Sequence, residues 1–422
     1  MRRSVTPVWP PTRGRGTLVS VAIAGLVAAW TGGFALEATA EAPAPLVPPT
    51  AEVRALWVVR TALVSPAEVD RVVDRAAEAG FNTLLVQVRG RGDAFYSSRL
   101  VSRAPLIARQ PASFDPLARL LSRAKARGLA VHGWLNVLLT AHFGQPLPPG
   151  HILAEHPGWM MVPRSVAGVA LRARERDLRA LVGAAVRNDV DVEGYYLSPA
   201  SAAVGAHLTA VVRELVGNYA LDGLHLDFVR YPGGDYDYSR VALESFRSTR
   251  GGRGDLLGLA AGDPVAFAAH RRTVLTSLVS RLSRAARETR PGLVVSAAVV
   301  PGETEAQVSK GQAWGEWLDR GLLDVVCPMA YAEDERAYAQ QVSQIFARSS
   351  ASGRSVWVGI GAWRLPIGVV VGRVRLARQA GASGIALFSH ESLGESEAQR
   401  LRQEAFPVSD RAAVPGAALG TR

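Results

Sequence analysis

The chain has 422 residues, 48% of them hydrophobic, which is ample for a sizeable core in one large domain or two average ones. Its formal net charge of +11 comes almost wholly from arginines scattered through the expected helices. Because no basic tract with interleaved aromatic residues occurs, the charge favours solvated helix faces over nucleic-acid binding, and attraction to an acidic cell-wall polymer stays open. A single cysteine, Cys327, excludes an intramolecular disulfide and a cysteine-cluster metal site.

The N-terminus has the features of an export signal. Arg13 and Arg15 precede an apolar run over residues 18–30, and Ala-Thr-Ala at residues 38–40 offers a small-x-small cleavage site. A membrane span needs about 20 residues, and this run is shorter, which favours a cleaved signal peptide. An uncleaved membrane anchor is the alternative. The expected organisation is a signal peptide over 1–40, a Pro/Ala-rich linker over 41–51, a folded domain over 52–405 and a disordered tail over 406–422.

Short apolar runs alternate with helical segments along the folded part. Ser65 and Pro66 begin the first helix and Gly80 ends it. The strands are expected over residues 53–59, 83–88, 129–135, 224–229, 293–300, 325–331, 355–360 and 384–388. This alternation predicts an α/β fold, a parallel (β/α)8 barrel of the TIM type. It breaks over residues 139–201, which predicts a long insertion between the third and fourth strands.

Several classes of site lack their motifs. Gly90-Arg91-Gly92 follows the second strand without the third glycine and the helix start of a dinucleotide site. The eight histidines show no paired ligand spacing, and no G-x-S-x-G turn follows a strand. We therefore expect no cofactor, no metal and no serine-hydrolase chemistry.

The stretch LDGLHLDFVRYP, residues 221–232, carries the most informative strand end. A carboxylate such as Asp227 is costly to bury at the end of an apolar strand without a partner. The C-terminal mouth of a parallel barrel is also where catalytic groups lie. The alternative is that Asp227 only pairs with Arg230 to close a loop. His225 lies on the same strand face and is either a core histidine or a substrate contact.

The remaining strand ends form an expected rim of aromatic and hydrogen-bonding residues. Aromatic faces stack on sugar rings, and amide and guanidinium groups bond their hydroxyls. A single aromatic residue is more often part of the core, so the prediction depends on their concentration at strand ends. The expected substrate-binding residues are Gln87, Arg89, Asp93, Trp134, Asn136, His225, Arg230, Tyr231, Met329 and Tyr331.

Such a rim suits a glycosidase, and glycoside hydrolysis most often uses two carboxylates. Asp227 is the first expected catalytic residue. For the second we choose Glu303, because it follows the neighbouring strand, although an exposed loop glutamate would look the same. Asp93, Asp334 and Glu391 also lie just past strand ends and are further candidates for the second carboxylate.

Nine short motifs follow one another along the folded part: RALW (54–57), QVRGRGDAFY (87–96), FDPL (114–117), HGWLN (132–136), HPGW (156–159), YLSP (196–199), DGLHLDFVRYP (222–232), CPMAY (327–331) and LFS (387–389). In these motifs and in their order the chain resembles the glycosyl hydrolase-like family-10 proteins, a group of bacterial secreted barrel proteins. The resemblance implies the barrel fold and glycosidase activity, and one branch of the family acts on peptidoglycan glycan strands that lack stem peptides.

Three positions depart from the expected patterns. Lys125 stands where relatives often have histidine, and Ala313 where an aspartate is common. Val229 occupies the position of the catalytic glutamate in the chitinase strand motif, which disfavours chitinase-type substrate-assisted chemistry.

The sequence therefore predicts an exported, periplasmic or extracellular glycoside hydrolase that acts on a polysaccharide. The competing hypothesis is a non-catalytic glycan-binding barrel, since no second carboxylate stands out. The expected partner is a glycan strand and not a nucleic acid. A membrane is expected as a partner only if the N-terminal segment stays uncleaved, and no oligomeric state is predicted.

Overall fold

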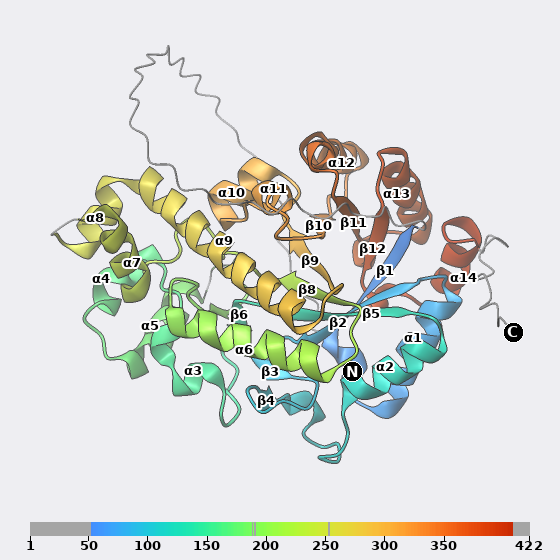
Figure 1. Cartoon of the computed structure of the whole chain (residues 1–422), viewed down its shortest axis with the longest axis horizontal. Coiled ribbons are helices and arrows are strands. Elements are labelled where there is room, and N and C mark those ends of the chain that lie inside the picture. Colours follow the sequence, from blue (N-terminus) through green and yellow to red (C-terminus); the bar gives the residue numbers. More distant parts are fainter. Residues whose placement is uncertain (1–51, 188, 190, 252–253, 408–422) are drawn as a thin grey trace, which may run out of the picture. The chain divides into compact units, whose positions relative to one another are not determined.

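Eight parallel strands form a closed barrel in the computed structural model, which describes residues 52–187, 189, 191–251 and 254–407 (Figure 1). Each strand pairs with the next one around the barrel, and β1 pairs with both β2 and β12, so the barrel is closed. The barrel strands are β1 (Val53–Val58), β2 (Thr83–Arg89), β5 (Ala130–Asn136), β8 (Gly223–Asp227), β9 (Val294–Val299), β10 (Val325–Ala330), β11 (Ser355–Gly361) and β12 (Gly384–Phe388). The predicted TIM-type barrel is confirmed.

The fourth barrel strand is shorter than predicted. It ends at Asp227 and not at Val229, because Phe228 has a left-handed backbone with φ of 49° that leaves the strand direction. The Phe228 backbone N–H donates to Asp227 Oδ1 at 2.6 Å, which ties the turn to the carboxylate. The predicted signal peptide, the linker and residues 408–422 of the predicted tail lie outside the described residues, so these boundaries stay predictions.

Helices surround the barrel, and their starts follow ordinary capping chemistry. Ser65 accepts a hydrogen bond from the Glu68 N–H at the start of α1, as its sequence predicts. Asp334 caps α12 in the same way. The helices are α1 (Pro66–Glu78), α2 (Pro116–Ala126), α3 (Ile152–Glu155), α4 (Ala167–Ala170), α5 (Glu175–Val186), α6 (Ala202–Asn218), α7 (Arg240–Arg250), α8 (Leu256–Gly262), α9 (Pro264–Thr289), α10 (Glu303–Lys310), α11 (Trp314–Asp319), α12 (Glu335–Ser349), α13 (Ile367–Gln379) and α14 (Glu395–Glu404).

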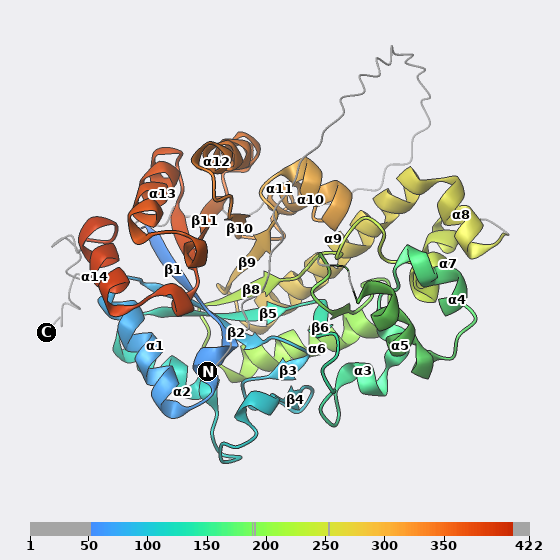
Figure 2. The same ribbon diagram turned by 180° about the vertical axis from the view of Figure 1, so that it is seen from behind.

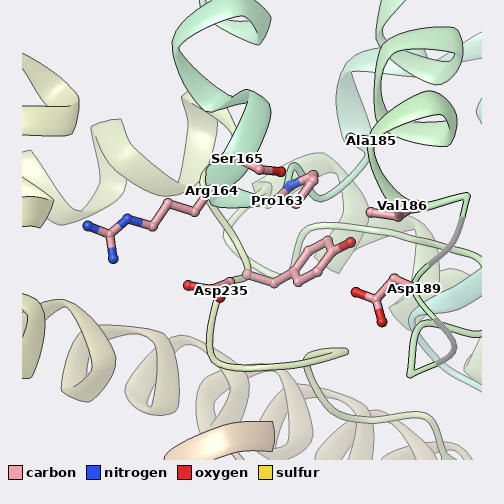
Figure 3. A pocket seen from close by; sticks show the side chains of 8 residues that line it. Pro163, Arg164, Ser165, Ala185, Val186, Asp189 and Asp235 are labelled. Atoms are coloured by element: carbon pink, nitrogen blue, oxygen red, sulfur yellow. The ribbon is translucent and has the colours of Figure 1, made fainter.

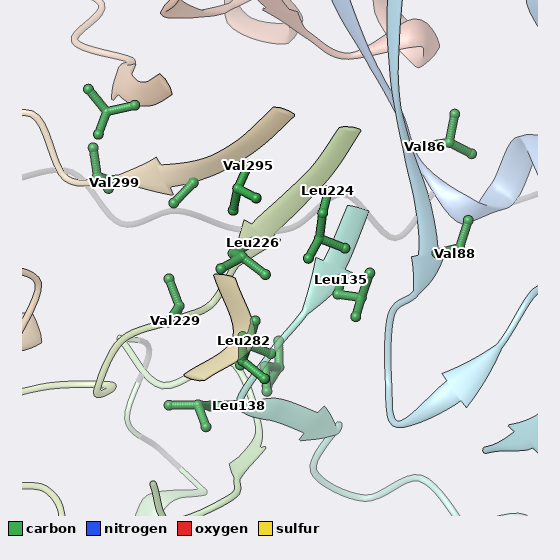
Figure 4. Packing of buried hydrophobic residues seen from close by; sticks show 14 of the residues in the cluster. Val86, Val88, Leu135, Leu138, Leu224, Leu226, Val229, Leu282, Val295 and Val299 are labelled. Carbon is green, nitrogen blue, oxygen red and sulfur yellow. The ribbon is translucent and has the colours of Figure 1, made fainter. Parts of the chain in front are cut away.

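Successive side chains of each strand point alternately into the barrel and out toward the helices. The molecule therefore has two apolar cores, one inside the barrel and one between the barrel and the helices. Outward-facing side chains such as Leu224 and Leu226 pack toward the helices, where Leu282 of α9 meets them (Figure 4). The smaller core fills the barrel interior and includes Trp57, Trp134 and Trp357 with small neighbours. Bulky rings and small residues therefore share the limited interior of an eight-stranded barrel.

One glycine shows how tightly the interior is packed. A Cβ on Gly223 would lie 2.3 Å from Nδ1 of His132, so the His132 ring needs glycine on the neighbouring strand. His132 is buried, and burial lowers its pKa to about 4, which keeps the ring neutral at neutral pH. The Asp222-Gly223 pair thus opens β8 and leaves room for this ring.

Residues between β5 and α6 form an additional layer that shares the outer core of the barrel. It contains α3, α4, α5 and a two-stranded antiparallel sheet of β6 (Leu139–Ala141) and β7 (Tyr195–Tyr196). Figures 1 and 2 show α3 to α5 gathered with α7 and α8 beside one side of the barrel, away from α13 and α14. Two further short strands, β3 (Asp93–Ala94) and β4 (Ser102–Arg103), extend the sheet from β2.

Among the described residues, no helix is both long and apolar enough to cross a bilayer. The same part of the chain has no cluster of three or more histidine, cysteine or acidic side chains that could hold a metal ion.

Candidate active site

Asp227 lies at the C-terminal end of β8, opposite Asn136 of β5, where the barrel opens. Only 7% of the residue is exposed. Burial raises the pKa of its carboxyl to about 6, and the negative charge of Glu193 also acts to raise it. Arg230 and the hydrogen bond from Phe228 act in the opposite direction. A carboxyl with this pKa exchanges its proton near neutral pH, as general acid–base catalysis requires.

Glu193 is a second carboxylate close to Arg230 and a candidate that sequence reasoning missed. It immediately precedes Gly194 and β7, and its Oε1 lies 2.8 Å from Nη2 of Arg230. Its Oε2 accepts a hydrogen bond from the Tyr196 hydroxyl. Arg230 and Tyr196 therefore hold the Glu193 carboxylate in place. The carboxylate is still accessible to solvent, because 26% of the side chain is exposed.

The local sequence explains how Glu193 reaches the mouth. A Cβ on Gly194 would lie 2.0 Å from the carbonyl oxygen of Ala141, so only glycine lets this segment pass β6. The two following tyrosines form β7 against β6. A glutamate followed by glycine and two strand-forming tyrosines is the one sequence signal that marks this residue, and its meaning depends on pairing with β6.

Arg230 links the two carboxylates. It is 2% exposed, makes the ion pair with Glu193, and its positive charge lowers the pKa of Asp227. Its guanidinium carbon lies 4.6 Å from the ring centre of Phe228, a cation–π contact that holds it in place. The ion pair with Glu193 therefore gives Arg230 a role beyond closing a loop with Asp227.

The amide side chains predicted to bind substrate form the floor of the mouth. Gln87 donates to Asn136 Oδ1 at 3.2 Å and accepts from Nη1 of Arg60 at 2.9 Å. Asn136 in turn donates to the carbonyl of Gly90 at 2.8 Å. Both amides are almost fully buried. Their hydrogen bonds therefore connect the ends of β2 and β5 inside the protein.

Arg89 and His225 lie deeper than predicted. Arg89 is 0% exposed and its Nη1 donates to the backbone carbonyls of Asn136 and Val137. His225 accepts a hydrogen bond from the Trp57 indole N–H at 3.1 Å and contacts Ser296 Oγ at 2.9 Å. Burial lowers the pKa of His225 to about 3, so its ring is neutral. Both residues are therefore used by the protein itself, and His225 fits the interpretation as a core histidine.

Aromatic side chains form one wall of the mouth. Tyr331 and Trp363 meet edge to face with ring centres 5.0 Å apart, and both contact Phe388. Met329 is half-buried at the end of β10, while burial and the ionised form of Asp227 raise the pKa of Tyr331. The buried indole N–H of Trp134 lies beside Asp227, whose pKa it lowers. Tyr331 and Met329 thus lie at the C-terminal end of β10, Trp134 belongs to the core inside the barrel, and the roles of all three in substrate binding stay predictions.

Tyr231 and Asp93 have structural partners. Tyr231 is 2% exposed and its hydroxyl donates to the carbonyl of Arg271 at 3.1 Å, so it packs under α9. Asp93 accepts the backbone N–H of Arg91 at 2.7 Å and holds the loop after β2.

Among the contacts of the described residues, Glu303 pairs with Arg348 and not with a residue of the Asp227 cluster. Glu303 is the first residue of α10, and its Oε1 lies 2.9 Å from Nε of Arg348 on α12. Arg348 also pairs with Asp319 at 2.6 Å, so the three residues join α10, α11 and α12. Because α10 starts immediately after the loop from β9, its first acidic residue also serves the helix N-terminus, and a catalytic role for Glu303 stays a prediction.

Asp334 and Glu391, two further candidates for the second carboxylate, also have local roles. Asp334 is the N-cap of α12, where its Oδ1 accepts the Ala337 N–H. Glu391 accepts a hydrogen bond from the Thr61 hydroxyl at 2.7 Å. Glu193 is thus the carboxylate that acts on Asp227.

A separate cavity of about 480 Å³ lies beside the insertion (Figure 3). It is lined by Pro163, Arg164, Ser165, Ala185, Val186, Asp189, Asp235 and Tyr236. Asp227, Glu193 and Arg230 do not belong to this lining, so the cavity and the barrel mouth are distinct features.

A closed parallel barrel with acidic and aromatic residues at its mouth has the architecture of the TIM-barrel glycoside hydrolases. The glycoside hydrolase domain of PgaB (BpsB) from Bordetella bronchiseptica is similar with a TM-score of 0.61 and 16% identity, over 85% of this chain and 100% of that one. The catalytic domain of β-amylase from Paenibacillus polymyxa has a TM-score of 0.58 and 11% identity, over 84% and 97%. At these identities the likeness shows the fold alone.

The sequence identifies the family. Residues 52–364 match the family described as glycosyl hydrolase-like 10, and the chain belongs to this family. The protein named glycosyl hydrolase DigH in Escherichia coli K12 is 24% identical over 305 residues, which cover 67% of this chain and 61% of the relative. A relative of the same name in Shigella flexneri matches equally. The chain thus spans about three fifths of the length of these relatives.

Proposed function

We propose that the chain is an exported glycoside hydrolase that acts on a polysaccharide, with Asp227 and Glu193 as its catalytic carboxylates. The observation that carries the proposal is the charge coupling of the two at the barrel mouth, where burial and Glu193 together raise the pKa of Asp227 to about 6. Membership of the glycosyl hydrolase-like 10 family supports it.

The raised pKa makes Asp227 the proton donor in this proposal. A protonated Asp227 gives its proton to the glycosidic oxygen as the bond to the sugar carbon breaks. Glu193 then either activates water or attacks the sugar carbon, and Arg230 holds it in position for that step. Burial of Asp227 favours its neutral form, the form a general acid needs before the reaction.

The aromatic wall supports a carbohydrate substrate. Tyr331 and Trp363 present two perpendicular rings at the mouth, and Met329 adds an apolar surface beside them. Peptidoglycan glycan strands are the first substrate to test, because the family resemblance includes enzymes that act on them.

Release of reducing ends tests this function. Purified protein is incubated with peptide-free peptidoglycan strands and with a panel of common polysaccharides, and both bound glycan and released ends are measured. We expect release from at least one glycan. Binding without release from any of them would favour the non-catalytic glycan-binding barrel instead.

Export is proposed from the N-terminal sequence alone. Sequencing the mature protein is expected to find Glu41 at its start. Recovery only in membranes with Met1 intact would show an uncleaved anchor.

A further inference from the structure

Phe228 is the residue that turns the chain away from the barrel at the proposed catalytic site. Among the described residues, it is the only one other than glycine with a left-handed backbone, and its φ is 49°. This conformation is unfavourable for a bulky residue, because the Cβ comes too close to the following carbonyl oxygen. Such residues persist where the surrounding structure fixes them, and they are concentrated at active sites. The position of this outlier directly after Asp227 therefore points to a role in the site.

Backbone hydrogen bonds hold the turn on both sides. The carbonyl of Asp227 accepts the Val137 N–H at 2.7 Å. The carbonyl of Phe228 accepts the Leu138 N–H at 3.3 Å. Within this fixed turn the Phe228 N–H donates to Asp227 Oδ1 at 2.6 Å. The backbone of Phe228 therefore holds the carboxyl of the proposed proton donor.

The ring of Phe228 contacts both partners of the other carboxylate. Its centre lies 4.6 Å from the guanidinium carbon of Arg230 and 6.1 Å from the ring centre of Tyr196. Arg230 forms the ion pair with Glu193, and the Tyr196 hydroxyl donates to the same carboxylate. A single residue thus contacts Asp227 through its N–H and both partners of Glu193 through its ring.

We propose that Phe228 is a positioning residue that holds Asp227 and Glu193 in a fixed relative arrangement. Its backbone acts on Asp227, and its ring acts on Glu193 through Arg230 and Tyr196. This inference rests on the proposed function and adds a residue that carries neither an acid nor a base. Because a misplacement of about 1 Å can cost about 100-fold in rate, the contribution of Phe228 belongs to kcat and not to substrate binding.

Four substitutions separate the backbone of Phe228 from its ring. Phe228→Leu keeps the apolar bulk but removes the aromatic face, whereas Phe228→Tyr keeps that face. Phe228→Ala and Phe228→Gly both remove the ring, and only glycine adopts a left-handed backbone without steric cost. Phe228→Gly should therefore melt at a higher temperature than Phe228→Ala.

Phe246→Leu is the matched control. The Phe246 ring centre lies 5.8 Å from the guanidinium carbon of Arg250, and both residues belong to α7, which carries none of the proposed catalytic groups. The substitution therefore removes a ring beside an arginine at a place away from the chemistry. It should lower the melting temperature and leave kcat per folded molecule unchanged.

Turnover of the glycan that the wild type cleaves is the first readout. Phe228→Leu and Phe228→Gly should lower kcat by about 10- to 100-fold, while KM stays near its wild-type value. Phe228→Tyr should keep kcat near that of the wild type, because the aromatic face beside Arg230 is retained.

The titration of Asp227 is the second readout, and it needs no turnover. In the wild type the pKa of this carboxyl is about 6; Arg230 acts to lower it and Glu193 acts to raise it. Loss of the ring loosens Arg230, so the pKa should rise above 6 in Phe228→Leu and Phe228→Gly. The Asp227 carboxyl resonance, assigned by its absence from Asp227→Asn, is followed by NMR between pH 4 and 9. Phe246→Leu should leave this titration unchanged.

Two results would overturn the positioning role. One is a folded Phe228→Leu with wild-type kcat and a wild-type Asp227 titration, and the other is a Phe228→Tyr that loses as much kcat as Phe228→Leu. If Phe228→Ala and Phe228→Gly do not fold, the comparison of Phe228→Leu with Phe228→Tyr still decides. A wild type that cleaves no glycan would reject the hydrolase, while a raised Asp227 pKa in Phe228→Leu would still support the role of the ring. The two proposals therefore fail separately.

Discussion

At the scale of single residues, burial gives Asp227 its chemistry. A carboxyl with a pKa near 6 is largely protonated below that pH and largely ionised above it. The buried position and the neighbouring Glu193 both favour the protonated form, while Arg230 limits the effect. Asp227 is buried, whereas Glu193 is partly exposed and paired with Arg230. Such different environments let one of two carboxylates act as a proton donor while the other acts as a base or nucleophile.

The pH profile should report this protonation. As proton donor, Asp227 must be protonated in the free enzyme, so kcat/KM should fall as the pH rises through about 6. The measurement is kcat/KM between pH 4 and 9 on the cleaved glycan. A rate that instead rises through pH 6 and stays high to pH 9 would show that the ionised form is the active one.

The same shift predicts an effect on stability. The folded pKa of Asp227 lies above its value of about 3.9 in the unfolded chain. Stability is therefore lost as the pH rises from about 4 through 6, because the folded state resists ionisation. Asp227→Asn should lower turnover by about 10²–10⁴-fold and should melt no lower than wild type at pH 7.

Melting curves at pH 4 and pH 7 provide the check. Any gain in melting temperature by Asp227→Asn should be larger at pH 7 than at pH 4. A variant that melts several degrees lower at pH 7 with near-normal turnover would mean that Asp227 is a structural partner of Arg230.

At the scale of elements, β7 positions Glu193. The hydroxyls of its two tyrosines have different partners, because successive side chains of a strand point to opposite faces. Tyr196 donates to Glu193, whereas Tyr195 donates to the carbonyl of Arg179 on α5 at 3.1 Å. Tyr195 can therefore serve as the control for a substitution of Tyr196, because its hydroxyl does not contact Glu193.

Tyr196→Phe should lower kcat by about 10- to 100-fold, because Glu193 loses one of its two fixed partners. Tyr195→Phe removes an equivalent hydroxyl and should leave kcat near wild type. Each substitution should cost about 1 kcal/mol of stability. Turnover and denaturant unfolding of both variants are compared; equal losses of kcat would mean that β7 acts only through packing.

At the scale of the whole molecule, periodicity predicts the barrel but not all of its site. The eight strands are short apolar runs bounded by turns and helices, a local pattern that also marks Asp227 at the end of β8. Glu193 precedes a two-residue strand whose position depends on pairing with β6, which lies on the far side of three intervening helices in the sequence. The local pattern of a glutamate, a glycine and two tyrosines therefore does not by itself place Glu193 at the mouth.

The choice of Glu303 over Glu193 from the sequence has the same origin. An acidic residue just after a strand is either a catalytic group or the first residue of the next helix, and the two look alike in sequence. At Glu303 the contact that favours the second reading is the ion pair with Arg348 on α12, which the sequence does not reveal. His225 is a comparable case, since its partners Trp57 and Ser296 come from two other strands.

The most direct test compares the two glutamates. Glu193 and Glu303 form similar ion pairs, at 2.8 Å with Arg230 and 2.9 Å with Arg348, and their side chains are equally exposed at 26%. Glu193→Gln and Glu303→Gln are therefore matched changes, measured by kcat on the glycan that the wild type cleaves. Glu193→Gln should lose about 100-fold or more and Glu303→Gln should stay near wild type. Full turnover in Glu193→Gln, with loss in Glu303→Gln, would contradict the proposed site.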